Sequence, residues 1–341
     1  MLLLRWLAQQ RGPQQSISVL DGLAGCGIRS LRYGLEAGAS EICSNDADPL
    51  RLPLLEENLA PLAAACRLEL SSQTIQKLLA LCLQQERRFD LVDLDAFGAA
   101  TQLLPLALEA VSLGGILYLA SSDGRSHTGH DRRAALRRLG AAARAQPCSW
   151  ELALRLQLGA IARAAWMVGR GVRPLLSLSE GRTFRTAVQV LRSPAPGEEA
   201  LLGLQAYCHS CGNHWGQSLL HWRGLGLCTC GGDPVCSGPL WRGPLQDTAV
   251  LSAALGLDTA TLGAGGRRLL ARLQLDAGLP PEASAWADLG RCLGGGPPPQ
   301  QSMLRLLHQQ GWQALASAIQ PGQFRTDAPW QEVLRLAPEA R

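Results

Sequence analysis

The sequence predicts an α/β fold with a parallel sheet in residues 1–197, followed in residues 198–341 by a mainly helical α+β domain. Three observations support this prediction. From Ser18 onward, short apolar runs alternate with helical patterns, as in repeated β–α–β units. A Pro-, Gly- and Glu-rich segment at 194–200 then marks a domain boundary. Beyond it the alternation stops, and helical patterns follow that are interrupted by GGGPPPQQ at 294–301.

Five short apolar runs are the expected strands of the sheet, and they lie at 18–24, 40–46, 67–72, 89–98 and 116–123. The segments between them show helical periodicity, and these expected helices lie at 28–38, 49–66, 74–86 and 101–115. Strands joined by helices in this way pair in parallel through right-handed crossovers. The first half closes with two further helices and an antiparallel strand pair, at 131–145, 151–170, 172–181 and 183–193.

The composition excludes several classes of protein. With 47% hydrophobic and 18% charged residues, the 341-residue chain is neither disordered nor fibrous, and it has room for about two domains. Six of the eleven cysteines are scattered singly, which suits a reducing compartment better than a disulfide framework. No apolar run approaches the ~20 residues of a membrane span, and the N-terminus lacks the order of a signal peptide. We therefore expect a cytoplasmic enzyme that uses no membrane, and no obligate protein partner is evident.

A glycine-rich loop follows the first expected strand. The segment VLDGLAGCGIRS ends its strand at Asp21, places Gly25 and Gly27 in the loop and starts a helix at Ile28. Such glycines let the backbone approach a ligand at a helix N-terminus, although the spacing is not the GxGxxG of dinucleotide sites. Asp46 ends the next strand, where an acid can accept both ribose hydroxyls. The layout favours an adenosine ligand without a diphosphate, above all S-adenosylmethionine; the alternative is an ordinary turn in which Asp46 caps a helix.

The fourth expected strand ends with two acids and an aromatic residue, in the segment DLVDLDAFG. Strand alternation places Asp93 and Asp95 on one face, and Phe97 follows. Methylation of an amino group needs such a set, because a carboxylate that accepts from the N–H of a base localises the nitrogen lone pair and takes the proton. An aromatic ring stacks on the extruded base. The alternative is an Asp that caps the next helix and a Phe that lies in the core.

Five cysteines are clustered at 208–236, and the first two form a CxxC pair, the usual first half of a zinc site. The expected metal ligands are Cys208, Cys211, Cys228 and Cys230. The second half is irregular, so Cys236 could replace Cys230. Other substitutes in the cluster are His209, His214 and His221. The zinc would be structural, and the alternative is a former zinc module whose cysteines stay reduced and packed.

The net charge of +4 hides a strongly basic middle, because residues 125–185 carry twelve Arg against three acids. The arginines at helical spacing are Arg132, Arg133, Arg137 and Arg138, with Arg155 and Arg163 in the following helix. We expect this face to neutralise nucleic-acid phosphates, unless it is an ordinary solvated helix face. The C-terminal region has an aromatic and basic character that also suits RNA, through Trp215, Trp222, Trp241, Trp312, Trp330 and Arg325.

Several segments, read in order, resemble the tRNA guanine-26 N2-dimethyltransferase family. They include VLDGLAGCGIRSLRYGLE, NDAD, the strand and helix around DLDAFG, WELALRLQLGAIARAA, GPLWRGPLQD and LLHQQGWQALASAIQPGQFRTDAPW. The resemblance implies a Rossmann-like class I methyltransferase domain and a zinc-containing C-terminal domain that binds tRNA. It also implies transfer of one or two methyl groups from S-adenosylmethionine to N2 of guanine 26, and in some bacterial members to the neighbouring position as well.

Matching positions carry the family's residue roles onto this chain. The resemblance implies that Asp95 is the catalytic acid of the family's DPFG motif and that Phe97 packs on the target guanine. The implied cofactor-binding residues are Asp21, Gly25, Gly27, Arg29, Asp46 and Asp93. Asp123 follows the fifth expected strand, and we expect it to line the same crevice.

The chain departs from the family pattern at three places. Ala96 replaces the usual Pro of the DPFG motif, which leaves the loop less rigid. The third expected strand ends in Ser71, Ser72 and Gln73, where the family often has an acid near the adenine. The family also carries an aromatic segment and an Arg-Asp pair before its first strand, whereas this chain opens on MLLLRWL. We therefore expect that the chain starts at a downstream Met, lacks an upstream part of the active site and is weakly active or inactive as written.

Two other functions stay open at this point. One is a different nucleic-acid amino-methyltransferase that acts, for example, on adenine. The other is a catalytically inactive tRNA-binding relative, which a missing upstream segment would favour.

Overall fold

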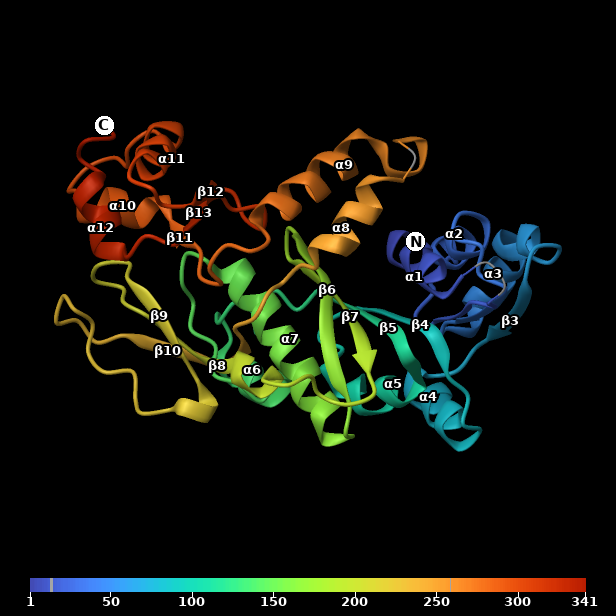
Figure 1. The fold of residues 1–341 in the computed structure, drawn as a ribbon. Coiled ribbons are helices and arrows are strands. Elements are labelled where there is room, and N and C mark those ends of the chain that lie inside the picture. The colour runs from blue at the N-terminus through green and yellow to red at the C-terminus, as the bar shows by residue number, and fades with distance from the viewer. Residues whose placement is uncertain (13–14, 258) are drawn as a thin grey trace.

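The computed structural model describes residues 1–12, 15–257 and 259–341, and a seven-stranded sheet forms its centre (Figure 1). The strand order is β3-β2-β1-β4-β5-β7-β6. The strands are β1 (Ser18–Asp21), β2 (Glu41–Asn45), β3 (Arg67–Ser71), β4 (Phe89–Ala96), β5 (Val111–Ser121), β6 (Gly171–Glu180) and β7 (Thr183–Leu191). Strands β1 to β5 are parallel, and β7 pairs antiparallel with both β5 and β6. The parallel sheet and its antiparallel strand pair, predicted from the sequence, are confirmed.

Helices cover both faces of this sheet, because each strand alternates its side chains between the two layers. Val19 and Leu91 pack on the first layer, whereas Leu20 and Val92 pack on the second. The first layer contains α1 (Leu2–Arg11), α2 (Ile28–Leu35), α3 (Leu52–Leu59) and α8 (Thr248–Leu255). The second contains α4 (Ile75–Gln84), α5 (Leu104–Ala110) and α7 (Ser149–Met167). Within the described residues, no helix is both long and apolar enough to cross a membrane.

The strand order reverses between β1 and β4, which are neighbours at the centre of the sheet. The ligand crevice of an open α/β sheet lies at such a reversal, beyond the carboxyl ends of the strands. Asp21 ends β1, Asn45 ends β2 and Ala96 ends β4. The fold therefore collects the strand-end residues singled out in the sequence at one edge.

The helix expected over 101–115 is shorter than predicted. Residues 101–103 form a 3-10 turn and α5 ends at Ala110, after which β5 begins at Val111 and includes the glycine pair. The reason is pairing with β4: Val111 is the register partner of Phe89, and an irregularity between Phe89 and Leu91 absorbs the extra residues. The two glycines therefore belong to an irregular strand start, not to a helix end.

The mainly helical character expected of residues 198–341 is only partly seen. Two three-stranded sheets lie there, formed by β8 (Leu202–Tyr207), β9 (His214–Ser218), β10 (Val235–Trp241), β11 (Ser284–Ala285), β12 (Ala314–Ala316) and β13 (Gln323–Thr326). The helices beyond α8 are α9 (Thr259–Asp276), α10 (Trp286–Cys292), α11 (Gln300–Gln309) and α12 (Trp330–Leu336). The strands are short and lack a clear apolar alternation, which explains why the sequence pattern did not show them.

Helix α7 lies at the junction between the two halves of the chain. A Cβ atom at Gly159 would lie 2.9 Å from the Cα of Leu240, so the backbones of α7 and β10 touch. Nearby lies a buried set of charges that we call the junction cluster, composed of Glu151, Arg155, Asp276 and Arg325. The division of the chain at residue 197 stays a prediction.

Candidate active site

The carboxyl ends of β1 and β4 bring three acids together. Asp21 and Asp93 are register partners on the two neighbouring strands, and both are fully buried. Asp95 lies two residues beyond Asp93 on the same face of β4 and is half-buried. Buried carboxylates in such proximity need a cation or hydrogen-bond donors, because burial and mutual repulsion both disfavour the charged form.

A single guanidinium, that of Arg29, contacts all three acids from the first turn of α2. Its Nε lies 3.3 Å from Asp93 Oδ2, its Nη2 lies 3.8 Å from Asp21 Oδ1, and its Nη1 pairs with Asp95. We call Asp21, Arg29, Asp93 and Asp95 the strand-end cluster. Burial and the neighbouring Asp93 raise the pKa of Asp21 to about 7, and burial also raises the pKa of Asp93. One arginine therefore only partly offsets three acids.

Two uncharged hydroxyl groups donate hydrogen bonds to the acids of the strand-end cluster. Tyr33 donates a hydrogen bond of 2.6 Å to Asp93 Oδ2, and Ser30 donates one of 2.8 Å to Asp21 Oδ2. Both donors lie on α2, so the helix that follows the glycine loop also binds the acids. The other oxygens, Asp21 Oδ1 and Asp93 Oδ1, accept no hydrogen bond from any described residue.

The glycine loop has the backbone that the sequence predicted. Gly25 and Gly27 have φ values of +60° and +80°, in the region that favours glycine, and α2 starts directly afterwards. The Gly25 N–H donates a hydrogen bond of 2.9 Å to Asp46 Oδ2, while Asp46 Oδ1 accepts one of 3.0 Å from the Asp48 N–H. Asp46 therefore lies against the loop at the end of β2.

The end of β3 adds polar groups to the same edge. Asn45 donates hydrogen bonds of 3.0 Å to the carbonyls of Gly22 and Gln73, which joins the ends of three strands. Ser71 Oγ and Gln73 Oε1 are buried and have no hydrogen-bond partner among the described residues. A buried polar atom without a partner costs free energy of folding. Four such atoms lie at this edge of the sheet, two on the carboxylates of Asp21 and Asp93 and two on Ser71 and Gln73, and a ligand with several hydrogen-bond donors could satisfy them. This set of hydrogen-bond acceptors therefore suits the adenosine cofactor expected from the sequence.

Phe97 projects from the loop after β4 and is fully exposed. The loop is fixed to the end of β5, because the Gly98 carbonyl accepts a hydrogen bond of 2.7 Å from Ser121 and its N–H donates one of 2.8 Å to Ser122 Oγ. An exposed aromatic ring beside a half-buried carboxylate is available to a flat ligand. The structure thus places Asp95 and Phe97 at the same strand end.

Sequence reasoning missed Arg185, which approaches Asp95 from β7. Its Nη1 lies 3.9 Å from Asp95 Oδ2 and donates a hydrogen bond of 3.3 Å to the Tyr118 hydroxyl. Its Nε pairs with Glu180 at 3.0 Å. No sequence signal could have found it, because the antiparallel register between β5 and β7 is not visible in the sequence.

The Asp123 carboxylate, which follows β5, is held by residues of its own loop and by Arg138. It accepts hydrogen bonds from the backbone N–H and the hydroxyl of Ser126, and it pairs with Arg138. Burial opposes ionisation, but these donors outweigh it and lower the pKa of Asp123 to about 2. The carboxylate thus holds the loop after β5 in shape.

The arginines expected to face phosphates separate into two groups. Arg132, Arg133 and Arg137 are exposed on α6 (Arg132–Leu139). Arg155 is buried, because its guanidinium bonds Glu151 and the carbonyls of Trp241 and Gly243, so the prediction for it is wrong. Arg163 donates to the last carbonyls of α6.

The C-terminal residues expected to contact RNA are also mostly interior. Arg325 is buried in the junction cluster, and Trp241 and Trp330 are buried in apolar cores. Trp222 is exposed, whereas Trp215 and Trp312 are half-buried. Large aromatic rings are more often used for packing than for ligand contacts, which accounts for this outcome.

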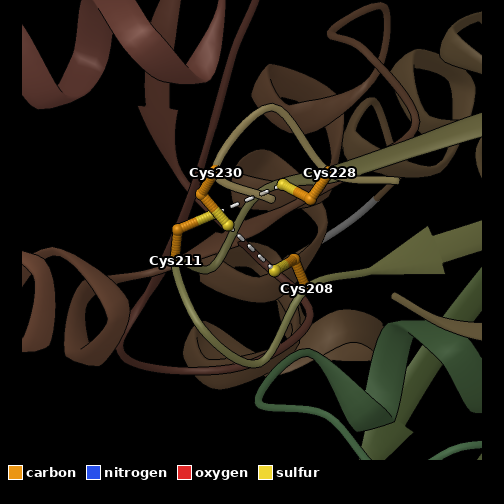
Figure 2. Close-up of side chains that lie close together, drawn as sticks. All are labelled: Cys208, Cys211, Cys228 and Cys230. Atoms are coloured by element: carbon orange, nitrogen blue, oxygen red, sulfur yellow. Dashed lines mark hydrogen bonds between the residues drawn. The ribbon is translucent and has the colours of Figure 1, made fainter. Parts of the chain in front are cut away.

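The four cysteines expected as metal ligands come together in loops at the end of the β8–β10 sheet (Figure 2). All four Sγ atoms lie within 4.8 Å of one another, with Cys208 3.6 Å from Cys230 and Cys211 3.5 Å from Cys228. Sulfurs on a tetrahedral zinc lie about 3.8 Å apart, so the arrangement fits that ion. Cys236 lies instead on β10, outside this group.

Known proteins are similar to this chain over most of its length. The sequence model of the N2,N2-dimethylguanosine tRNA methyltransferase family matches residues 1–337. A protein of Aeropyrum pernix named tRNA (guanine(26)-N(2))-dimethyltransferase is 30% identical over 334 residues, which cover 92% of this chain and 80% of that protein. A Pyrococcus furiosus protein of the same name is 28% identical over 344 residues, covering 93% and 86%. Trm1 from Pyrococcus horikoshii, solved with S-adenosyl-L-methionine, has a TM-score of 0.84 at 22% identity and covers 98% of this chain and 91% of that chain. The last comparison shows a common fold.

Proposed function

This chain belongs to the N2,N2-dimethylguanosine tRNA methyltransferase family, and we propose that it transfers one or two methyl groups from S-adenosylmethionine to N2 of guanine 26 in tRNA. The observation that carries the proposal is the strand-end cluster, which lies where the sheet reverses its strand order. Transfer to the neighbouring tRNA position, known for some bacterial members of the family, is part of the same proposal.

The cofactor would be held by residues around the glycine loop. Asp46 is placed to accept the ribose hydroxyls, and Gly25 and Gly27 let the loop approach the ligand. S-adenosylmethionine supplies an electrophilic methyl group on a positively charged sulfonium. Asp21 and Asp93 each have one oxygen that accepts no hydrogen bond from the described residues, and the lone pairs of these oxygens suit such a cation.

Asp95 and Phe97 would act on the target base. The lone pair of guanine N2 is delocalised into the ring, and Asp95 localises it by accepting a hydrogen bond from N2–H. The N2 lone pair forms the new C–N bond as the C–S bond breaks, and Asp95 takes the proton that N2 loses. Phe97 stacks on the extruded base. Arg29 pairs with Asp95 and holds its carboxylate in position.

Zinc would have a structural role at Cys208, Cys211, Cys228 and Cys230. Four thiolates leave no open coordination position, so the ion would hold loops together without taking part in the chemistry. The Cys211 carbonyl accepts hydrogen bonds from Trp330 Nε1 at 2.8 Å and from Cys292 Sγ at 3.1 Å, so the site also fixes the C-terminal helices. We expect one zinc per chain by atomic emission, and a chain without zinc would contradict this assignment.

Arg132, Arg133 and Arg137 on α6 would contact tRNA phosphates, since they are exposed and unpaired with acids in the described residues. We also propose that the chain divides near residue 197 into a methyltransferase domain and a tRNA-binding domain. The tRNA substrate and the scattered free cysteines support a cytoplasmic location.

The test is methylation of an unmodified tRNA transcript by the purified chain. We expect one or two methyl groups on N2 of guanine 26, identified by mass after nuclease digestion, at the low rate that the sequence predicts for this chain. A transcript with adenine at position 26 is the matched control and should gain none there. Methylation of adenine, or no transfer with the cofactor bound, would contradict the proposal.

A further inference from the structure

Arg185 reaches Asp95 across an intervening strand. Asp95 is the register partner of Ala120 on β5, and Ala120 is the register partner of Arg185 on β7. The three side chains therefore point to the same face of the sheet. Because Ala120 offers only a methyl group, the arginine can extend over it, and its Nη1 comes within 3.9 Å of Asp95 Oδ2. A longer side chain at position 120 would occupy that path.

The guanidinium of Arg185 is held in place but keeps free donors. Glu180 pairs with its Nε at 3.0 Å, and the Tyr118 hydroxyl accepts from Nη1 at 3.3 Å. Within the described parts of the chain, Nη2 donates no hydrogen bond. Arg29 differs, because it contacts three carboxylates and a carbonyl. Arg185 is thus the cation beside Asp95 that can still bind a ligand.

A cleft of about 460 Å³ lies against both arginines that contact Asp95. Arg29, Arg185 and Tyr118 form part of its polar wall. Leu176 and Leu178 contribute to the apolar wall. The cleft adjoins Asp95 through these two arginines, and neither Asp95 nor Phe97 is among its lining residues. A flat base whose polar edge meets Asp95 and Arg185 would therefore enter it with one ring face toward the leucines, which leaves the other face for Phe97.

The edge of guanine presents two donors and then an acceptor. N2–H and N1–H are adjacent, and the carbonyl oxygen O6 follows. A carboxylate accepts from both donors, and an arginine donates to O6. Adenine offers the carboxylate only one donor beside the lone pair of N1, and it has no carbonyl oxygen. A carboxylate with a cation at its side is therefore complementary to guanine.

We propose that Arg185 is a specificity-determining residue that donates a hydrogen bond to O6 of the target guanine while Asp95 accepts from N1–H and N2–H. This inference rests on the proposed function, because it takes guanine N2 as the methyl acceptor. Tyr118 and Glu180 are positioning residues that hold the guanidinium.

The test compares guanine with 2-aminopurine at tRNA position 26, because 2-aminopurine keeps the reactive amine and lacks O6. It also lacks the N1 proton, but the lost N1–H contact with Asp95 weakens the unaltered protein and the variant alike and cancels when the two are compared. We expect Arg185→Met to lower kcat/KM for guanine about 10- to 100-fold, the range of one charge-assisted hydrogen bond. The rate for 2-aminopurine should change less than about 3-fold, since that base offers Arg185 no carbonyl. Its retained turnover also shows that the variant is folded. Arg185→Lys should recover part of the preference for guanine.

The control is Arg192→Met, an exposed arginine just beyond the opposite end of β7, which should leave both rates unchanged. The dissociation constant for S-adenosylmethionine, measured by calorimetry, should be the same in all variants. An equal loss for both bases would overturn the inference, because it would mean that Arg185 acts only through Asp95. An unchanged preference in Arg185→Met would overturn it as well. If the unaltered protein methylates neither base, the proposed function fails instead.

Discussion

The strand-end cluster and the junction cluster are built from the same chemical groups and differ in how fully these groups are paired. In the junction cluster, two arginines meet two acids, and no buried side-chain oxygen or nitrogen of the four lacks a partner. In the strand-end cluster, one arginine meets three acids, and two buried carboxylate oxygens have no hydrogen bond from the described residues.

This difference separates a structural set of charges from a functional one. A closed network stabilises one arrangement of the chain, because each buried charge has its full set of partners. An incomplete network leaves atoms that a ligand can satisfy, and titratable groups with perturbed pKa values cluster at such sites. The same residue types can therefore be assigned different roles from their pairing alone.

The largest effect is expected at the exposed end of the strand-end cluster. Asp95→Asn removes the acceptor for the N2 proton, so we expect kcat to fall about 10²- to 10⁴-fold, the usual contribution of a general base. The melting temperature should change little, because Asp95 is half-buried and Arg29 keeps its contacts with Asp21 and Asp93. Single-turnover methylation and thermal unfolding measure the two effects. A stable variant with unaltered kcat would assign Asp95 no part in the chemistry.

The junction cluster should respond in the opposite way. Glu151→Gln removes the carboxylate shared by Arg155 and Arg325, and we expect unfolding to become easier by about 3–5 kcal/mol, the cost of leaving buried charges unpaired. Urea titration measures this change, and Glu199→Gln, the same replacement at an exposed acid, should stay within about 0.5 kcal/mol. Equal effects from Glu151→Gln and Glu199→Gln would mean that the junction cluster is not structural.

A smaller effect concerns pH. Because the folded protein holds the Asp21 proton up to about pH 7, while the unfolded chain releases it near pH 4, stability should fall as the pH rises between these values. The slope from this one group is at most about 1.4 kcal/mol per pH unit. Asp21→Asn should flatten the dependence, and Asp233→Asn, at an exposed acid, should not. Unfolding free energies at several pH values test this, and parallel curves for Asp21→Asn and the unaltered protein would contradict it.

Much of the site could be predicted because it follows the chain locally. Asp21, Asp46 and Asp95 each lie at or just beyond the end of a parallel strand, and parallel strands with helical crossovers end at one edge. The cysteine spacing likewise indicated a four-thiolate group. What escaped prediction depends on tertiary pairing. Arg185 is found only through the antiparallel register of β7.

The errors have a related cause. Arg155 and Arg325 were expected at the surface because charged residues usually lie there. Their burial becomes visible only when α7 and β13 are brought together around Glu151. Sequence spacing can show which residues share a face of one element, but not which element covers that face. The same limit applies to the short strands of the C-terminal half.

Gly159 allows helix α7 and strand β10, which join the two halves of the chain, to pack closely. The methyl group that any other residue would add has no room against Leu240, so α7 and β10 meet backbone to backbone. The contact between α7 and β10 lies between the central sheet, which carries Asp95, and the C-terminal half, which contains the four-cysteine group (Figure 1). The contact between α7 and β10 therefore fixes the separation of these two parts within the protein itself, independently of any bound ligand. Any side chain at position 159 would therefore push α7 and β10 apart and change the distance between that sheet and the C-terminal half.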